Sequence, residues 1–150
     1  MLKNIPSIIS PELLKTLNEM GHGDTLVIAD GNFPGASVAK TNGAKLIRCD
    51  GLGVPELLRA ILALFPLDTY VDKPVGLMGV ARGAIQVEVP IWEQYYAIVS
   101  EQDERGLNAF RTIERFAFYE EAKKAYAVIA TSETAIYANV ILQKGVVTAS

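Results

Sequence analysis

The sequence has a single histidine, His22, which lies between two glycines in the segment Gly-His-Gly-Asp. Because glycine carries no side chain, a ligand could approach the ring closely. An imidazole titrates at about pH 6.5, so it can donate or accept a proton near neutrality, and His22 is a candidate for general acid–base catalysis. The alternative interpretation is structural, because a protonated histidine at a helix end is stabilised by the helix dipole.

Asp30 is the second candidate, since it follows the apolar run Leu-Val-Ile-Ala and begins the loop Asp-Gly-Asn-Phe-Pro-Gly. An ionised carboxylate at the end of a buried strand could accept hydrogen bonds from the hydroxyl groups of a sugar-like ligand. The sequence Asp-Gly-Asn is equally typical of an Asx turn, in which the carboxylate bonds local backbone N–H groups. Both interpretations are open at this point.

Four polar side chains near the C-terminus could also reach a ligand: Arg115, Tyr119, Tyr137 and Asn139. The first two lie at the start of an expected helix, and the last two lie just before or at the start of an expected strand. The alternatives are an aromatic residue in the core, an ion-paired or solvated arginine, and turn residues before the strand.

Other kinds of site are poorly supported. The segment around Gly51 and Gly53 lacks the third glycine of a dinucleotide fingerprint and the Lys-Ser/Thr pair of a P-loop. With one histidine and one cysteine, Cys49, the chain offers no zinc-ligand cluster and no recognisable nucleophile–histidine motif. We therefore expect no metal ion and no cofactor.

Hydrophobic patterning predicts helices and strands that alternate along the chain. Ser10 and Pro11 are typical of a helix start, and Gly21 is expected to end that helix in the left-handed conformation. Further helices are expected over residues 53–65, 91–102 and 116–125, and strands over residues 25–30, 44–50, 74–80, 126–131 and 137–145. The segments 80–90 and 100–108 are expected to be surface loops.

This alternation predicts a three-layer α/β domain with a largely parallel sheet. Ligands of such folds bind beyond the carboxyl ends of the strands. His22 precedes its strand, whereas Asp30 follows it. Either the chain must fold back to bring His22 to the site, or another subunit must deliver it.

The overall composition is that of a globular protein of 150 residues with a net charge of −3 and half its residues hydrophobic. The acidic balance argues against a nucleic-acid partner. The apolar run at the N-terminus is short and is broken by Pro6, which argues against a signal peptide, and the longest apolar run is far below the roughly 20 residues that span a bilayer. The length predicts one domain, and the lack of a long apolar run predicts a soluble protein. Because a single cysteine cannot form an intramolecular disulfide, we also expect the protein to be cytoplasmic.

Five segments together closely resemble the family of ribose pyranases and L-fucose mutarotases, and more closely its fucose branch. They are residues 9–24, 28–35, 47–62, 115–129 and 137–146, and the resemblance is weakest between about residues 81 and 110. It implies one domain over residues 1–150 that interconverts the anomers or ring forms of a free monosaccharide without a cofactor. It also implies a homo-oligomer, typically a ring-like decamer, with sites near the subunit contacts.

The resemblance also assigns roles to individual residues. It implies that His22 is the proton donor and that Asp30 and Arg115 bind sugar. The segment Tyr137, Ala138 and Asn139 matches another part of the family's sugar site, in which Ala138 would contribute its backbone. We add Tyr119 as an aromatic or hydroxyl contact.

The expected activity is therefore that of an isomerase, an L-fucose mutarotase. One departure concerns the sugar: Gly31 and Asn32 stand where fucose mutarotases often carry Ala and His. The alternatives are a ribose pyranase and a module that binds a monosaccharide without converting it. The ribose branch tends to use a second histidine, which this chain lacks, and hydroxyl recognition alone needs no titrating group.

Overall fold

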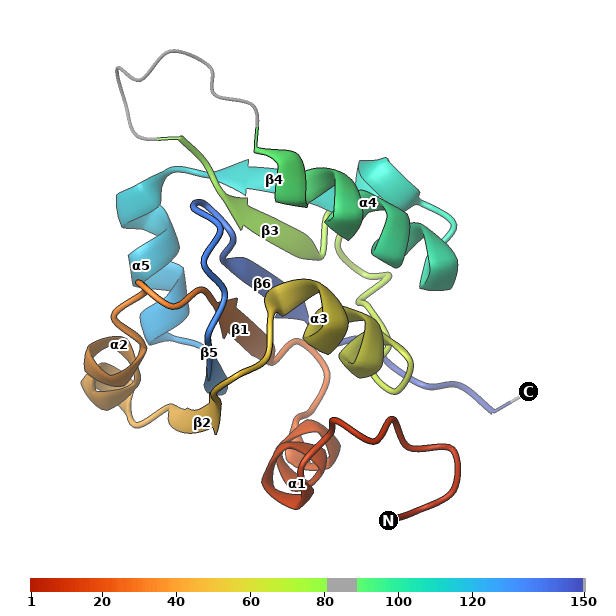
Figure 1. Ribbon diagram of the computed structural model, residues 1–150. Helices are drawn as coiled ribbons and strands as arrows, with labels where there is room; N and C mark the ends of the chain where they lie inside the picture. Colours follow the sequence, from red (N-terminus) through yellow and green to blue (C-terminus); the bar gives the residue numbers. More distant parts are fainter. Residues whose placement is uncertain (81–88, 150) are drawn as a thin grey trace.

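The described part of the chain forms one six-stranded sheet with helices on both faces (Figure 1). The computed structural model describes residues 1–80 and 89–149. The strands are β1 (Thr25–Ala29), β2 (Lys45–Cys49), β3 (Val75–Met78), β4 (Phe110–Ile113), β5 (Ala127–Thr131) and β6 (Val140–Gln143). The helices are α1 (Pro11–Glu19), α2 (Gly35–Asn42), α3 (Val54–Leu62), α4 (Pro90–Gln102) and α5 (Arg115–Lys123), with a short 3₁₀ helix at Gly106–Ala109.

The strand order is β2-β5-β1-β6-β3-β4, and only β6 runs against its neighbours within this sheet of described residues. The pairs β1–β5, β2–β5 and β3–β4 are parallel. The sheet is therefore largely parallel, as the sequence predicts. Because β6 is reversed, it begins at the edge of the sheet where β1 and β3 end.

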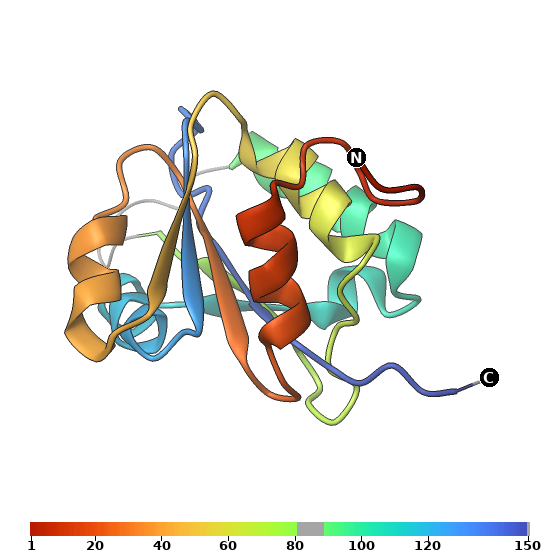
Figure 2. The same cartoon turned by 90° about the horizontal axis from the view of Figure 1, so that it is seen from below.

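Alternate residues of the strands supply two hydrophobic cores, one on each face. Along β1, Leu26 and Ile28 join the core beneath α1, α3 and α4, whereas Val27 joins the core beneath α2 and α5. Figure 2 shows the twisted sheet between these two helical layers. The expected three-layer architecture is confirmed. No helix within the described ranges is both long and apolar enough to cross a membrane.

The start of α1 matches its prediction, but its end does not. The Ser10 hydroxyl accepts a hydrogen bond from the Leu13 N–H at 3.1 Å, as an N-cap should. Gly21 is not left-handed: the chain turns at Gly23, with φ +87°, and Met20 is extended. The ammonium group of Lys144 bonds the carbonyl groups of Leu17 and Met20, so a lysine from the far end of the chain closes this helix.

Among the described residues, α2, β4 and the 3₁₀ helix were not predicted. The helix α2 has few large apolar residues, so its buried face of Val38 and Ala39 gives little periodic signal. The strand β4 has four residues, of which only Phe110 and Ile113 are buried, so it gives a weaker apolar signal than the equally short β3 and β6. Part of the expected loop 100–108 is helical, since α4 continues to Gln102 and the 3₁₀ helix begins at Gly106. Most of the expected loop 80–90 lies outside the described residues.

Tyr95 of α4 holds the turn that leads into β6. Its fully buried hydroxyl donates to the carbonyl of Ala138 at 2.8 Å. We predict that Tyr95→Phe lowers the free energy of unfolding by about 1–3 kcal/mol, because the carbonyl group loses its partner in a dry site. Urea denaturation would measure this, with Tyr96→Phe as the control, since Tyr96 also packs against the same hydrophobic core but its hydroxyl makes no hydrogen bond within the described residues. Equal losses in the two variants would contradict the prediction.

Candidate functional site

A pocket of about 350 Å³ lies at the edge of the sheet where β1 and β3 end and β6 begins. It is within the size range of small-molecule sites. Its lining residues are Asp30, Asn32, Phe33, Met78, Arg115, Tyr119, Ile136, Tyr137 and Asn139. The structure therefore brings together five of the predicted site residues, from segments more than 100 positions apart in the sequence.

Asp30 is the most buried charged group of this pocket, with 8% of its surface exposed. Its carboxylate accepts the backbone N–H of Asn32 at 3.0 Å, so the Asx turn is real, and the residue still lines the pocket. Burial raises the pKa of Asp30 above its ordinary value, and the charge of Glu133 acts in the same direction. Backbone N–H groups of Asn32, Ala138 and Phe33 only partly offset this. A carboxylate whose burial is only partly offset by these donors is suited to accept further hydrogen bonds from ligand hydroxyl groups.

Asn139, which immediately precedes β6, fixes the position of Asp30. Its amide oxygen accepts the backbone N–H of Asp30 at 2.7 Å, and its amide nitrogen lies 3.8 Å from the sulfur of Met78. The side chain is buried, so it is locked between the ends of β1 and β3. Asn139 thus contributes to the pocket both as a lining residue and as a brace.

Arg115 and Tyr119 line the pocket from the first two turns of α5. The guanidinium Nε donates to the Tyr119 hydroxyl at 3.3 Å, and its central carbon lies 5.6 Å from the centre of the Tyr119 ring. The Phe33 ring packs against Tyr119 at 5.5 Å and edge-on to Phe118 at 5.9 Å. The pocket therefore offers a cationic donor beside aromatic surface, a combination that can hold the hydroxyl groups and the apolar face of a sugar.

Tyr137 and Ala138 make different contributions. Tyr137 lines the pocket with a left-handed backbone, φ +54°, and its carbonyl accepts the indole N–H of Trp92 at 2.8 Å. Ala138 is fully buried, and its carbonyl bonds Tyr95. Its backbone N–H lies near the Asp30 carboxylate, which agrees with a backbone contribution only.

His22 is not part of this pocket. It precedes β1, whereas Asp30 follows it, and a strand of five residues spans roughly 16 Å. The imidazole Nε2 lies 3.0 Å from a carboxylate oxygen of Asp68, and the ring meets the edge of Tyr70 at 4.7 Å. The chain does not fold back to bring His22 to Asp30. The helix-dipole interpretation is also wrong, because α1 ends at Glu19 and the ring is paired with Asp68.

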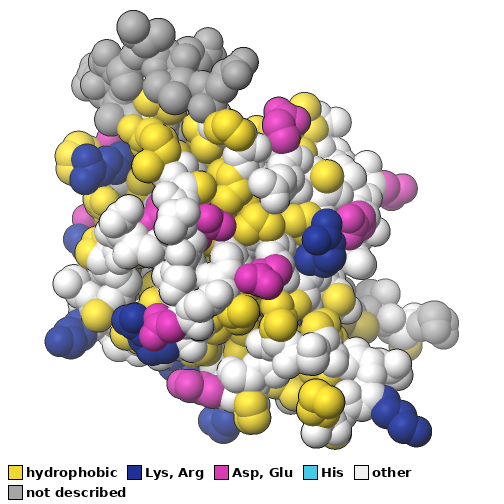
Figure 3. All heavy atoms as spheres, in the orientation of Figure 1, with side chains coloured by type: hydrophobic (Ala, Val, Ile, Leu, Met, Phe, Trp, Pro, Cys, Tyr) yellow, Lys and Arg dark blue, Asp and Glu magenta, His cyan; other side chains and the backbone are white. Residues whose placement is uncertain are grey.

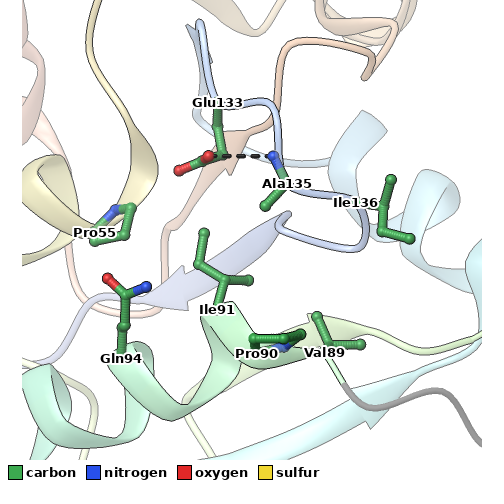
Figure 4. Close-up of a pocket in the computed structure, with 8 residues that line it drawn as sticks. All are labelled: Pro55, Val89, Pro90, Ile91, Gln94, Glu133, Ala135 and Ile136. Carbon is green, nitrogen blue, oxygen red and sulfur yellow. Dashed lines mark hydrogen bonds between the residues drawn. The ribbon is translucent and has the colours of Figure 1, made fainter.

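A second pocket, of about 500 Å³, adjoins the first through Ile136 (Figure 4). It is larger but mainly apolar, and it lies between the first turns of α3 and α4; Figure 3 shows hydrophobic side chains exposed on this face of the molecule. Its carboxylate, Glu133, already accepts the backbone N–H groups of Val54, Thr134 and Ala135 at 3.0–3.2 Å. This pocket therefore has fewer polar groups to orient a sugar than the first.

Sequence reasoning missed several residues of the site. Phe33, Met78 and Ile136 line the pocket, and Asn32 was noted only as a departure from a family pattern. Phe33 and Met78 could have been found, because each lies at or just after the carboxyl end of a strand. Asp68, the partner of His22, carries no local signal. In residues 1–80 and 89–149 no cluster of three or more His, Cys, Asp or Glu side chains is arranged to hold a metal ion.

The fold and the pocket define an α/β protein with a small polar site at the carboxyl edge of its sheet. The chain belongs to the RbsD / FucU transport protein family, whose sequence pattern matches residues 3–147. This confirms the family resemblance inferred from the sequence.

Individual relatives are similar over almost their whole length. The chain is 52% identical over 149 residues to the fucose mutarotase of Danio rerio, covering 98% of this chain and 95% of that protein. The crystal structure of FucU from Bifidobacterium longum superposes with a TM-score of 0.93 at 60% identity, covering 97% of this chain and 100% of that one. The crystal structure of the fucose mutarotase from Streptococcus pneumoniae in complex with L-fucose superposes with a TM-score of 0.88 at 51% identity, covering 98% and 100%.

The raised pKa of Asp30 gives a stability prediction with a defined sign. The folded state binds the proton of the Asp30 carboxyl group more tightly than the unfolded state does. The free energy of unfolding therefore falls as the pH rises from the ordinary pKa of 3.8 through the raised pKa of the folded state. We predict that Asp30→Asn is more stable than the wild type at pH 7 and that this advantage disappears on acidification below the ordinary value. Thermal denaturation across that pH range would measure the difference.

Asp50→Asn is the matched control, because Asp50 also follows a strand and precedes a glycine but is exposed and paired with Arg48 at 2.8 Å. An Asp50→Asn variant that gains as much stability at pH 7 as Asp30→Asn would show that burial is not the cause.

Proposed function

We propose that the protein is a cofactor-independent L-fucose mutarotase, an isomerase that interconverts the α and β anomers of the free sugar. The observation that carries this proposal is the pocket built by Asp30, Arg115, Tyr137 and Asn139 in a chain 51% identical to a fucose mutarotase crystallised with L-fucose. Its apolar lining of Phe33, Met78 and Ile136 suits the methyl group of a 6-deoxy sugar.

The reaction needs one acid and one base. A cyclic sugar opens when its ring oxygen gains a proton and its anomeric hydroxyl loses one; rotation about the first carbon–carbon bond and reclosure then give the other anomer. In this proposal His22 donates and recovers the proton, Asp30 and Arg115 bind sugar hydroxyl groups, and Tyr119, Tyr137, the Ala138 backbone and Asn139 complete the pocket. Positioned proton transfer contributes about 10²–10⁴-fold, enough for a reaction that already occurs in water.

His22 must then come from a second copy of the chain. Since His22 and Asp30 lie at opposite ends of β1, the contact joins the amino edge of one sheet to the carboxyl edge of the next. Both regions expose apolar side chains: Tyr70 beside His22 is 76% exposed, and Phe116 and Ile136 beside the pocket are 68% and 63% exposed. A head-to-tail contact of this kind forms a ring when the rotation between successive copies closes, which is compatible with the ring-like decamer that the family resemblance implies.

The proposal includes a compartment and a range of partners. We infer that the protein acts in the cytoplasm on a free monosaccharide, because its single cysteine, Cys49, is a free buried thiol. Its partners are the sugar and further copies of itself, with no nucleic acid or membrane.

We predict that the wild type accelerates exchange between the anomeric protons of L-fucose and that His22→Ala reduces the exchange to the spontaneous rate. Exchange NMR would measure both, with D-ribose as the second substrate and circular dichroism to verify folding. Faster exchange of ribose ring forms than of fucose anomers would favour a ribose pyranase. Saturable binding without acceleration would leave a sugar-binding module.

A mixing experiment tests the shared site. His22→Ala and Asp30→Asn should each be inactive alone, but after the two are unfolded and refolded together, about one quarter of the contacts would join an intact His22 to an intact Asp30. We predict recovery of about that fraction of the wild-type rate. No recovery in mixed oligomers verified by mass spectrometry would rule out delivery of His22 by a second copy.

A further inference from the structure

We propose that Asp68 is a positioning residue for His22: its carboxylate holds the Nε2–H of the ring and leaves Nδ1 as the atom that exchanges a proton with the sugar. The proposal rests on the proposed function, in which His22 is the proton donor. It adds the orientation of the ring, the identity of the reacting nitrogen and a residue 46 positions away in the sequence.

The Asp68 carboxylate is buried and held by three donors. One oxygen accepts the backbone N–H of Tyr70 at 2.9 Å and faces His22 Nε2 at 3.0 Å. The other accepts the side-chain amide of Gln143 at 3.0 Å. Only 2% of the Asp68 side chain is exposed, against 37% of the His22 side chain. The carboxylate is thus the fixed member of the pair, and it can define where the more exposed ring lies.

The backbone around Asp68 is also fixed. Its N–H donates to the carbonyl of Gln143 at 3.0 Å, and its carbonyl accepts from Arg105 at 3.1 Å. Arg105 also bonds the carbonyl of Val71 at 3.1 Å and is paired with Asp103. Hydrogen bonds therefore hold the loop that carries Asp68 and Tyr70 both to β6 and to the segment after α4.

The charge of the carboxylate determines which nitrogen carries the proton. Burial alone would raise the pKa of Asp68, but the bonds from Tyr70, His22 and Gln143 outweigh it, and the pKa lies below its ordinary value. An ionised carboxylate only accepts hydrogen bonds, so the ring nitrogen 3.0 Å away must be the protonated one. In the neutral ring Nδ1 is then unprotonated and can take a proton.

The same contact favours proton exchange in both directions. When Nδ1 takes a proton, the ring becomes a cation beside the negative carboxylate, which stabilises it; when the ring gives the proton up, the Nε2–H bond keeps its orientation. His22 makes no second hydrogen bond to any residue in the described part of the chain, so Nδ1 is left for a ligand. Tyr70 limits the tilt of the ring by its edge contact at 4.7 Å and an interplanar angle of 88°.

Nitrogen NMR of the wild-type protein tests the proton assignment without any substrate. Because the sequence has one histidine, both imidazole ¹⁵N signals belong to His22. At about pH 8.5, above the range where imidazoles titrate, we expect Nε2 to resonate as a protonated nitrogen, with a proton coupled to it, and Nδ1 as an unprotonated one. A neutral ring protonated on Nδ1 would overturn the proposal.

Kinetics of Asp68→Asn tests the consequence for turnover. Asparagine keeps an oxygen for Tyr70 and His22 but removes the charge. We expect the maximal rate of anomer exchange to fall about tenfold or more, because the protonated ring loses its counter-charge. The KM for L-fucose should change less than about threefold, since Asp68 does not line the sugar pocket.

Asp24→Asn is the matched control, because Asp24 lies in the His22 loop but accepts the backbone N–H of Gly21, at 2.7 Å, rather than the ring. It should retain the wild-type rate. An Asp68→Asn protein with an unchanged maximal rate, or one whose loss appears only in KM, would overturn the proposal. If the wild type itself does not accelerate exchange, the proposed function fails instead, and the NMR assignment still decides the position of the ring.

Discussion

The antiparallel strand β6, inserted between β1 and β3, is the constraint on which the rest of the structure depends. Its reversed direction brings the segment from Tyr137 to Asn139 to the edge where β1 and β3 end, and the sugar pocket forms there. At its other end Gln143 holds the Asp68 carboxylate, and the following Lys144 closes α1 and pairs with the loop of His22. One short strand therefore organises both the pocket and the loop of the candidate acid, although these lie at opposite ends of the sheet.

Two buried carboxylates at those ends differ in whether their hydrogen-bond donors outweigh the cost of burying a charge. Asp68 has three hydrogen-bond donors, and its pKa is lowered despite its burial. Asp30 also has three backbone donors, but they do not outweigh the cost of burying its charge, to which the nearby charge of Glu133 adds, and its pKa is raised. The first is therefore a permanent counter-charge that orients a ring. The second lines the sugar pocket, where it can accept further hydrogen bonds from a ligand with several hydroxyl groups.

The sequence predicts much of this architecture because apolar periodicity determines which segments can be buried. Sequence patterning predicted five of the six strands and four of the five α-helices in the described residues. The helix α2 was missed because small residues such as Ala39 form its buried face. The pocket was partly predictable, since Asp30 follows a buried strand. The pair of His22 and Asp68 was not, because nothing local in the sequence links a histidine before β1 to an aspartate in a loop before β3. The prediction for the end of α1 was wrong for a similar reason, because Lys144, far away in the sequence, closes the helix instead of Gly21.

The left-handed backbone of Tyr137 has a consequence for how a sugar is bound. A tyrosine with φ +54° is in a conformation that costs of order 1–3 kcal/mol and that persists only when its surroundings enforce it. Here the indole of Trp92 and the hydroxyl of Tyr95 clamp the carbonyl groups of Tyr137 and Ala138 from α4. Folding already supplies the free energy for this conformation, so this side of the pocket is rigid before the sugar binds. Little binding free energy is then lost to ordering these residues.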